Sequence, residues 1–383
     1  MKHSLGLCGV LLCFLLPAAM GQQPAGTGAQ APAKGPVQVA AVQGAPVTGA
    51  RNAAANSDRG DQDARRDLHL DVVVTDKAGR PTPGLSGADF SLLDNDQPRK
   101  ILSFEAHAPG AAEAPTEIII LFDTVNVPFE SVSYARQQVG NFLEQNGGHL
   151  THPVALYFLT DTKVVGQEKP STDGEGLAAH LEATEGRVRA ENRVYGDFGR
   201  IERFQYSLKM ISAIIERLQT EPGRKLLIWV GPGWPMLDEP GLDFSTQQQQ
   251  KLFANIVGFS TLMRQARVDL YSISLGSPDR GTYLYESYVK GVKKVTQAQA
   301  PNLGLKVLAV QSGGLALAPD NNLTAAIDTC IQDAGTYYSL SFEAPPAGGP
   351  NEYHELKVRV DQPGLTARTN TGYYDQPDKT LTP

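Results

Sequence analysis

Four largely apolar runs lie in the middle of the chain and predict strands that are buried on both faces. Each run is short, contains β-branched or aromatic side chains, and passes into a loop of polar or glycine residues, as is typical of a parallel sheet. The runs are Ile118–Phe122, Val154–Thr160, Lys225–Gly231 and Val268–Leu275.

The segments between these runs carry the spacing of helices. Over Ile201–Gln219 apolar residues return at every third or fourth position, which aligns them on one helix face. The alternation of strand and helix from Glu117 to about Ala334 predicts a doubly wound α/β domain with a mostly parallel sheet. The other predicted elements are helices over Ser131–Gln145, Thr246–Gln265, Leu303–Gln311 and Leu323–Asp333, a helix that begins near Leu177, and a short strand over Leu315–Ala318.

The two flanks of this domain, residues 64–112 and 336–376, have the shorter alternation of antiparallel strands. About three short strands in each flank cannot bury an apolar face alone. We therefore predict that the flanks together form one small antiparallel β-sandwich, into which residues 113–335 are inserted. The predicted strands are Leu68–Thr75, Phe90–Leu93, Lys100–Glu105, Tyr337–Glu343, Glu352–Val360 and Leu365–Thr369.

The first 63 residues predict export and a tether. Lys2 and the apolar run Leu5–Leu16, followed by small residues, have the layout of a signal peptide over residues 1–21. Residues 22–63 are rich in Ala, Gly, Pro and Gln and lack aromatic residues, which predicts a disordered linker. No apolar stretch reaches the roughly 20 residues of a transmembrane helix. We expect an exported protein, periplasmic or extracellular, with no transmembrane segment.

Charge and cysteine content narrow the function. The chain has 34 Lys and Arg against 41 Asp and Glu and no dense basic stripe, so nucleic acid is not an expected partner. Of three cysteines only Cys330 lies beyond the predicted signal peptide, which excludes an intramolecular disulfide in the mature chain. The sequence does not determine the oligomeric state.

The loop after the first buried strand holds the main candidate site. Ligands of doubly wound sheets bind at the carboxyl ends of the strands. Here Asp123 is followed by Thr124 and Asn126, and later strands lead to Asp161 and Gly231. Candidate ligand-binding residues at this edge are Asp123, Thr124, Asn126, Asp161, Asp197 and Trp234, the last as an exposed contact residue.

This loop resembles the first metal loop of the von Willebrand factor type A domain. In that family an Asp-x-Ser-x-Ser motif, a Thr and a further Asp hold Mg²⁺ or Mn²⁺ for a partner's acidic side chain. The leading Asp matches Asp123, but Val125 and Val127 replace both serines, and Gly231–Gly233 replaces the later Asp. The site is thus degenerate: we expect no metal cofactor, with Asp123 only a weak candidate ligand for Mg²⁺ or Mn²⁺. The alternative is that Asp123 and Thr124 fix the loop and cap the next helix.

The resemblance extends over roughly Asp67 to Tyr374. The flanking segments and the loop around Ser312–Gly314 are similar to the VWFA-related family of exported acidobacterial proteins. That resemblance implies a type A domain embedded in β flanks, secretion, and no established biochemical activity.

Catalytic motifs do not offer a better interpretation. A hydrolase elbow of the form Gly-x-Ser-x-Gly does not occur, and Gly276–Ser277 is followed by Pro278. Pro153 prevents a helix from placing the rings of His149 and His152 on one face, and no acidic residue lies at a metal-ligand spacing, which favours a solvated loop over a metal site. We therefore predict a non-enzymatic, adhesion-type module that binds a protein or an envelope or surface component. The alternative is a hydrolase-like enzyme with an unrecognised active site at the strand carboxyl ends.

Overall fold

The computed structural model describes residues 67–108, 116–126, 129–167, 169–184, 196–234, 244–275, 285–319 and 322–377. The predicted signal peptide and linker, residues 1–21 and 22–63, lie outside the described residues. None of the helices in the described part is long and apolar enough to cross a membrane.

The inserted domain is built on a mixed, mostly parallel sheet of strand order β11-β10-β9-β5-β6-β7, with β8 also paired to β6. The five strands from β11 to β6 run parallel, whereas β7 and β8 are antiparallel to β6. This order confirms the predicted doubly wound, von Willebrand factor type A-like α/β fold. The strand bounds are β5 Glu117–Asp123, β6 His149–Leu159, β7 Val164–Gly166, β8 Ser171–Asp173, β9 Lys225–Val230, β10 Val268–Ile273 and β11 Ala316–Leu317.

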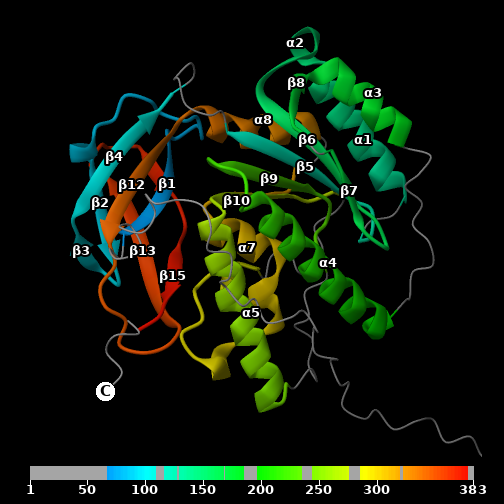
Figure 1. The fold of residues 1–383 in the computed structure, drawn as a ribbon. Coiled ribbons are helices and arrows are strands. Elements are labelled where there is room, and N and C mark those ends of the chain that lie inside the picture. The colour runs from blue at the N-terminus through cyan, green and yellow to red at the C-terminus, as the bar shows by residue number, and fades with distance from the viewer. Residues whose placement is uncertain are drawn as a thin grey trace, which may run out of the picture. The chain divides into compact units, whose positions relative to one another are not determined.

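Helices cover both faces of this sheet (Figure 1). Alternate residues of β5 point to opposite sides: Ile118 and Ile120 pack with α1, α3 and α8, and Ile119 and Leu121 with α4, α5 and α7. Both faces of the strand are therefore apolar. The helices are α1 Phe129–Leu143, α2 Gln145–Gly148, α3 Gly174–Thr184, α4 Gly196–Leu218, α5 Thr246–Gln265, α7 Leu305–Gln311 and α8 Leu323–Gly335, with 3₁₀ turns at Gly87–Asp89, Tyr285–Tyr288, Val295–Gln297 and Ala300–Leu303.

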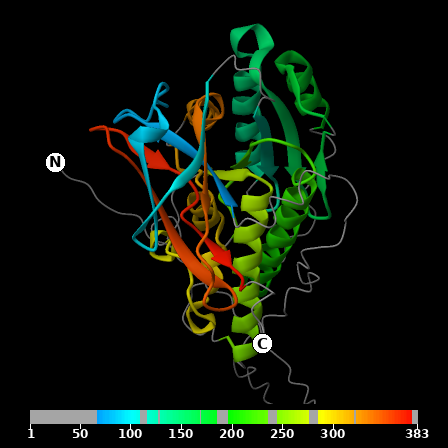
Figure 2. The ribbon, with the colours of Figure 1, turned by 60° about the vertical axis from the view of Figure 1, so that its left-hand side comes forward.

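The two flanks form one β-sandwich, as the sequence predicts. Its sheets have the orders β14-β1-β12-β4 and β15-β13-β2-β3, so each sheet contains strands from both ends of the described chain. Figure 2 shows these blue and red segments side by side, in agreement with the antiparallel pairing of β1 with β12 and β14. The strands are β1 Asp67–Thr75, β2 Phe90–Asp94, β3 Gln97–Arg99, β4 Ile101–His107, β12 Tyr337–Glu343, β13 Glu352–Val360, β14 Thr366–Arg368 and β15 Gly372–Asp375.

Two of these strands, β3 and β15, are additional to the predicted set. The chain reverses within Asn95 and Asp96, which both have positive φ, so Gln97 already belongs to the returning strand. Pro98 is compatible with β3 because this strand is at the edge of its sheet and pairs only with β2.

Charged side chains join the β-sandwich to the α/β domain. Arg267, between α5 and β10, donates from Nε and Nη2 to the two carboxylate oxygens of Asp71 on β1, over 3.0 and 2.7 Å. Ser339 of β12 donates to the same carboxylate over 2.7 Å. Arg368 of β14 donates from Nη2 to Asp333 of α8 over 2.6 Å. Ion pairs from β1 and β14 therefore fix the sandwich to the inserted domain.

We expect Arg267→Lys to lower the free energy of unfolding by about 1–2 kcal/mol, because Lys keeps the charge but loses the planar two-pronged donor. Urea titration of the full chain measures this. The matched control is Arg80→Lys, since Arg80 also donates from Nε and Nη2 to a carboxylate, to one oxygen of Asp76 at an exposed turn, and exposed pairs contribute little. Equal losses in the two variants would contradict the interface role of Arg267.

Candidate functional site

Asp123 is the last residue of β5. It lies at the carboxyl edge of the sheet, by which we mean the side at which the parallel strands end. The parallel register aligns it with Leu159, the end of β6, and aligns Phe122 with Val230, the end of β9. The loops that follow these strands therefore begin at the same edge. The Asp123 side chain is buried, with 2% of the residue exposed, and this burial raises its pKa.

The Asp123 carboxylate accepts four hydrogen bonds. Its Oδ1 accepts from the backbone N–H of Val125 and of Asn126, over 3.0 and 2.9 Å. Its Oδ2 accepts from Asn126 Nδ2 over 2.9 Å and from Trp229 Nε1 over 3.1 Å. These donors oppose the rise in pKa that burial causes. The carboxylate thus ties the loop to its own strand and to β9, in agreement with the expected loop-fixing role.

The second half of that expectation, helix capping by Asp123 and Thr124, stays a prediction, because residues 127 and 128, just before α1, lie outside the described residues. The bonds from Asp123 reach residues 125 and 126, whereas α1 begins at Phe129. Within the described residues the carboxylate closes a local turn.

Thr124 and Asn126 attach the same loop to other elements. The hydroxyl of Thr124 donates to the carbonyl of Leu159 over 2.6 Å, which holds the loop against the end of β6. Asn126 Nδ2 also reaches Oγ of Ser207 on α4, over 3.1 Å, while Asn126 Oδ1 is buried without a hydrogen-bond partner in the described part of the chain. Hydrogen bonds therefore attach the loop to β6, β9 and α4.

The remaining predicted residues are more scattered. Asp161 lies in the turn between β6 and β7. Burial, and to a lesser extent the charge of Asp161, raise the pKa of Tyr206 to about 12. Asp197 falls in the first turn of α4, but its side chain lies outside the described residues. The structure brings Asp123, Thr124 and Asn126 together and leaves Asp161 at the neighbouring strand end.

Trp234 differs from the expectation of an exposed contact residue. It is 4% exposed, donates from Nε1 to the carbonyl of Leu303 over 2.9 Å, and packs edge-on against Trp229. The loop that follows β9 turns inward at this point, so the indole is part of the core beneath the site.

Sequence reasoning missed the contributions of Trp229 and Gly231. A buried indole N–H needs an acceptor, and this was the available signal that Trp229, inside an apolar run, would seek a polar group. At Gly231 a Cβ atom would lie 2.7 Å from Cβ of Asp123, which is too close for any other residue without a shift. At the position where the resemblance to the von Willebrand factor type A family implies a carboxylate, this chain has a glycine that lies directly against Asp123.

The residues around Asp123 do not fit Mg²⁺ or Mn²⁺. A carboxylate offers about four lone-pair directions, and N–H donors take four here. Thr124 directs its hydroxyl hydrogen to a carbonyl, and Val125 is a buried apolar side chain. Among the described residues no group of three or more His, Cys, Asp or Glu side chains could hold a metal ion.

Comparison with known proteins identifies no family. No family model matches the chain, and no curated protein matches it. The assignment to the exported acidobacterial family therefore stays a prediction.

Solved structures similar to this chain include three proteins of low identity. Human COPII-coat protein Sec24c has a TM-score of 0.33 at 9% identity, covering 69% of this chain and 44% of that one. Manganese-loaded Plasmodium vivax TRAP protein has a TM-score of 0.33 at 10% identity, covering 70% and 97%. The pilus adhesin SpaC from Lactobacillus rhamnosus GG, in its open conformation, has a TM-score of 0.33 at 11% identity, covering 77% and 49%. The chain thus spans less than half of the Sec24c chain, and its fold assignment rests on strand order rather than on these scores.

Proposed function

We propose that the chain is an exported, non-enzymatic binding module of the adhesion type, which recognises a protein or an envelope or surface component without a bound metal ion. The observation that carries this proposal is the Asp123 carboxylate, whose lone pairs are taken by four N–H donors of the same chain. A carboxylate in this state supports the shape of a loop and offers no ligand position to a cation.

The same geometry argues against the alternative of a hydrolase. Asp123 is buried and saturated, so it has no free lone pair for a substrate or for a catalytic histidine. Ser207, whose hydroxyl accepts a hydrogen bond from Asn126, is fully buried. His149 and His152 are in β6 at the opposite edge of the sheet. Gly276–Ser277 lies outside the described residues.

Export is the second part of the proposal. It is supported by the layout of residues 1–21 and by the absence of an apolar stretch long enough for a membrane span elsewhere in the sequence. The proposed destination is the periplasm or the extracellular space, and we also propose that the chain belongs to the exported acidobacterial family. Intact-mass measurement of the secreted chain tests it, with the loss of about the first 21 residues as the expected result.

We expect partner binding to survive chelation. The test is capture of partners from an envelope fraction by the full mature chain, in Mg²⁺ and in EDTA, followed by calorimetry with the purified partner. The dissociation constant should agree within a factor of two in the two buffers, and Mg²⁺ alone should give no binding tighter than about 1 mM. Loss of the partner in EDTA would overturn the metal-free mechanism.

A matched pair of variants tests which edge of the sheet binds. Thr162→Arg places a bulky cation in the exposed turn after β6, at the carboxyl edge, and should weaken partner binding at least tenfold. Thr172→Arg makes the same change at an exposed position of β8, which pairs with the opposite end of β6, and should leave affinity unchanged. The reverse result would move the binding face to the amino edge.

A further inference from the structure

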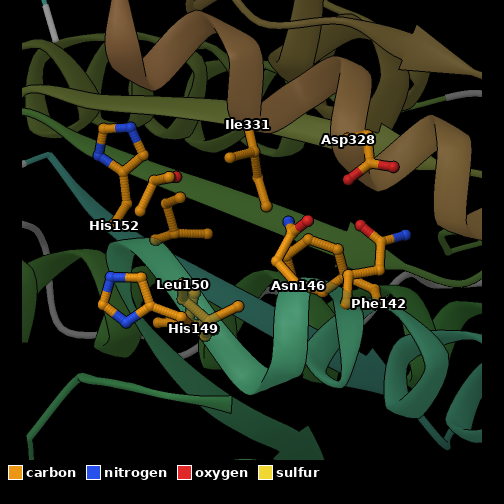
Figure 3. Close-up of a pocket in the computed structure, with 11 residues that line it drawn as sticks. Phe142, Asn146, His149, Leu150, His152, Asp328 and Ile331 are labelled. Atoms are coloured by element: carbon orange, nitrogen blue, oxygen red, sulfur yellow. The ribbon is translucent and has the colours of Figure 1, made fainter.

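A cavity of about 100 Å³ lies at the amino ends of β5 and β6, at the opposite edge of the sheet from Asp123 (Figure 3). Its walls come from the ends of α1 and α2, from the start of β6, and from α8. Phe142, Leu150 and Ile331 give part of it an apolar lining, and polar side chains line the rest. A cavity needs only roughly 10–15 Å³ to admit one water molecule, so this one admits a chain of several atoms.

The segment with His149 and His152 forms one wall, and the expectation of a loop there is wrong, although His149 is exposed to solvent as expected. Both residues belong to β6, because β8 pairs with the segment at His149 and again at Val154. The register shifts between these two pairs, so the strand is irregular where the histidines lie. In Figure 3 the two imidazoles lie together on one side of the cavity, and Asp328 lies on the other.

Among the residues that line the cavity, Asp328 is the one acidic side chain, and no basic side chain other than the two histidines is present. It is half-buried on α8, it accepts a hydrogen bond from the side chain of Gln145, and burial raises its pKa. No Lys or Arg lines the cavity, and Asp328 makes no ion pair with the described residues. A carboxylate withdrawn from water without a countercharge is costly, and a cation beside it would relieve that cost.

The groups opposite Asp328 are hydrogen-bonding side chains. Burial and the nearby charge of Arg224 lower the pKa of His152, which keeps its imidazole neutral, and its buried Nδ1 has no hydrogen-bond partner in the described part. Arg224 itself is paired with Asp269, with 2.5 Å between Nη2 and Oδ2. Asn146 adds an amide at the cavity mouth.

We infer that this cavity is a socket for a lysine side chain of a protein other than the partner proposed for the carboxyl edge. The four-carbon stem packs against Phe142, Leu150 and Ile331, as Lys stems do on apolar surface. The ammonium group has three N–H donors, which suit the Asp328 carboxylate and the amide oxygen of Asn146. The Asp328 carboxylate, together with the apolar side chains beside it, selects a primary ammonium on an alkyl chain over an anion.

The socket goes beyond the proposed function and is independent of it. It lies at the amino edge of the sheet and shares no residue with the Asp123 loop. Failure of metal-free binding at the carboxyl edge would leave the socket intact, and the reverse also holds.

The test uses the full chain and three small probes: N-acetyl-lysine N-methylamide, n-butylammonium and n-butanol. Ligand-observed NMR titration gives each dissociation constant, and labelled histidine imidazoles report whether the probe sits beside His149 and His152. Both cationic probes should bind in the millimolar range, which is ordinary for ligands of so few atoms, and should shift the imidazole resonances. Butanol should bind at least tenfold more weakly.

Asp328→Asn keeps the shape of the side chain and removes its charge, so it should weaken both cationic probes at least tenfold. Glu182→Gln removes an exposed charge of α3 that does not line the cavity and should leave both constants within a factor of two. Equal dissociation constants of butanol and butylammonium for the natural chain would by themselves overturn the socket, because the charge of the ligand would then not contribute to binding. Binding of butylammonium but not of the lysine amide would overturn the proposal that the ammonium group belongs to a protein. Tight Zn²⁺ binding that displaces the probes would assign the cavity to a metal.

Discussion

Replacement of Arg224 by Met should destabilise the protein by roughly 3–5 kcal/mol, because it removes one partner of a buried ion pair. The Arg224 side chain is fully buried and donates from Nε and Nη2 to one oxygen of Asp269, over 2.8 and 2.5 Å. Its Nη1 donates to the carbonyl of Asp333 near the end of α8, over 2.5 Å. The guanidinium also lies 4.5 Å above the ring of Tyr337 of β12, so it connects β9, β10, α8 and the sandwich.

The loss should depend on pH. Burial raises the pKa of Asp269 to about 6, above its ordinary value of 3.8, and Arg224 opposes that rise. For an acid whose pKa is higher in the folded state, stability is greatest below its ordinary pKa and falls as pH rises through the folded value. Without Arg224 the folded pKa rises further. The difference between the variant and the natural chain should therefore be largest at pH 8 and should shrink toward pH 5.

Urea unfolding of both proteins at several pH values measures this difference. The control is the double variant Arg224→Met/Asp269→Leu, which replaces the pair by apolar side chains and should recover at least half of the loss. A single variant that loses less than about 1 kcal/mol at pH 8 would show that Asp269 is reached by water when Arg224 is absent.

The buried pair illustrates which parts of the fold the sequence predicts. The run after Arg224 predicts β9 because its side chains are apolar, and apolar periodicity also predicts α5 with the observed bounds, Thr246–Gln265. Such patterns are formed by residues that lie close together in the sequence. The partner of Arg224 is Asp269, which is 45 residues away, and no local pattern joins them.

The same limit applies at strand ends and at the candidate site. The predicted start of β6 at Val154 is five residues late, because the polar His149–Pro153 stretch is held in the sheet by β8 rather than by its own composition. The Asp123 loop could be predicted as a turn from its Asp, Thr and Asn residues. Its connection to Trp229 could not, since that bond spans 106 residues.

Replacement of Asp123 by Ala is the second large expected effect, a loss of about 2–3 kcal/mol, more than an exposed cap would give. Ala leaves the buried N–H groups of Val125 and Trp229 without their acceptor. Asp123→Asn should cost nearly as much, because its amide hydrogens would face the N–H donors that now point at the carboxylate. Asp161→Ala, at the same edge but in the turn after β6, is the control and should change stability by less than about 0.5 kcal/mol.

The two tryptophans of the chain make the reason for this loss observable. Trp229 donates to Asp123, whereas Trp234 donates to the carbonyl of Leu303, so the Trp234 indole resonance is an internal reference. In Asp123→Ala the indole N–H resonance of Trp229 should move and exchange faster with solvent, while that of Trp234 stays in place. If instead neither indole moves and the natural chain gains stability from Mg²⁺ that the variant does not, then Asp123 is a metal ligand and its four hydrogen bonds yield to the cation. A shift confined to Trp229, with no response of either protein to Mg²⁺, would establish the carboxylate as the acceptor that holds this edge of the sheet in shape.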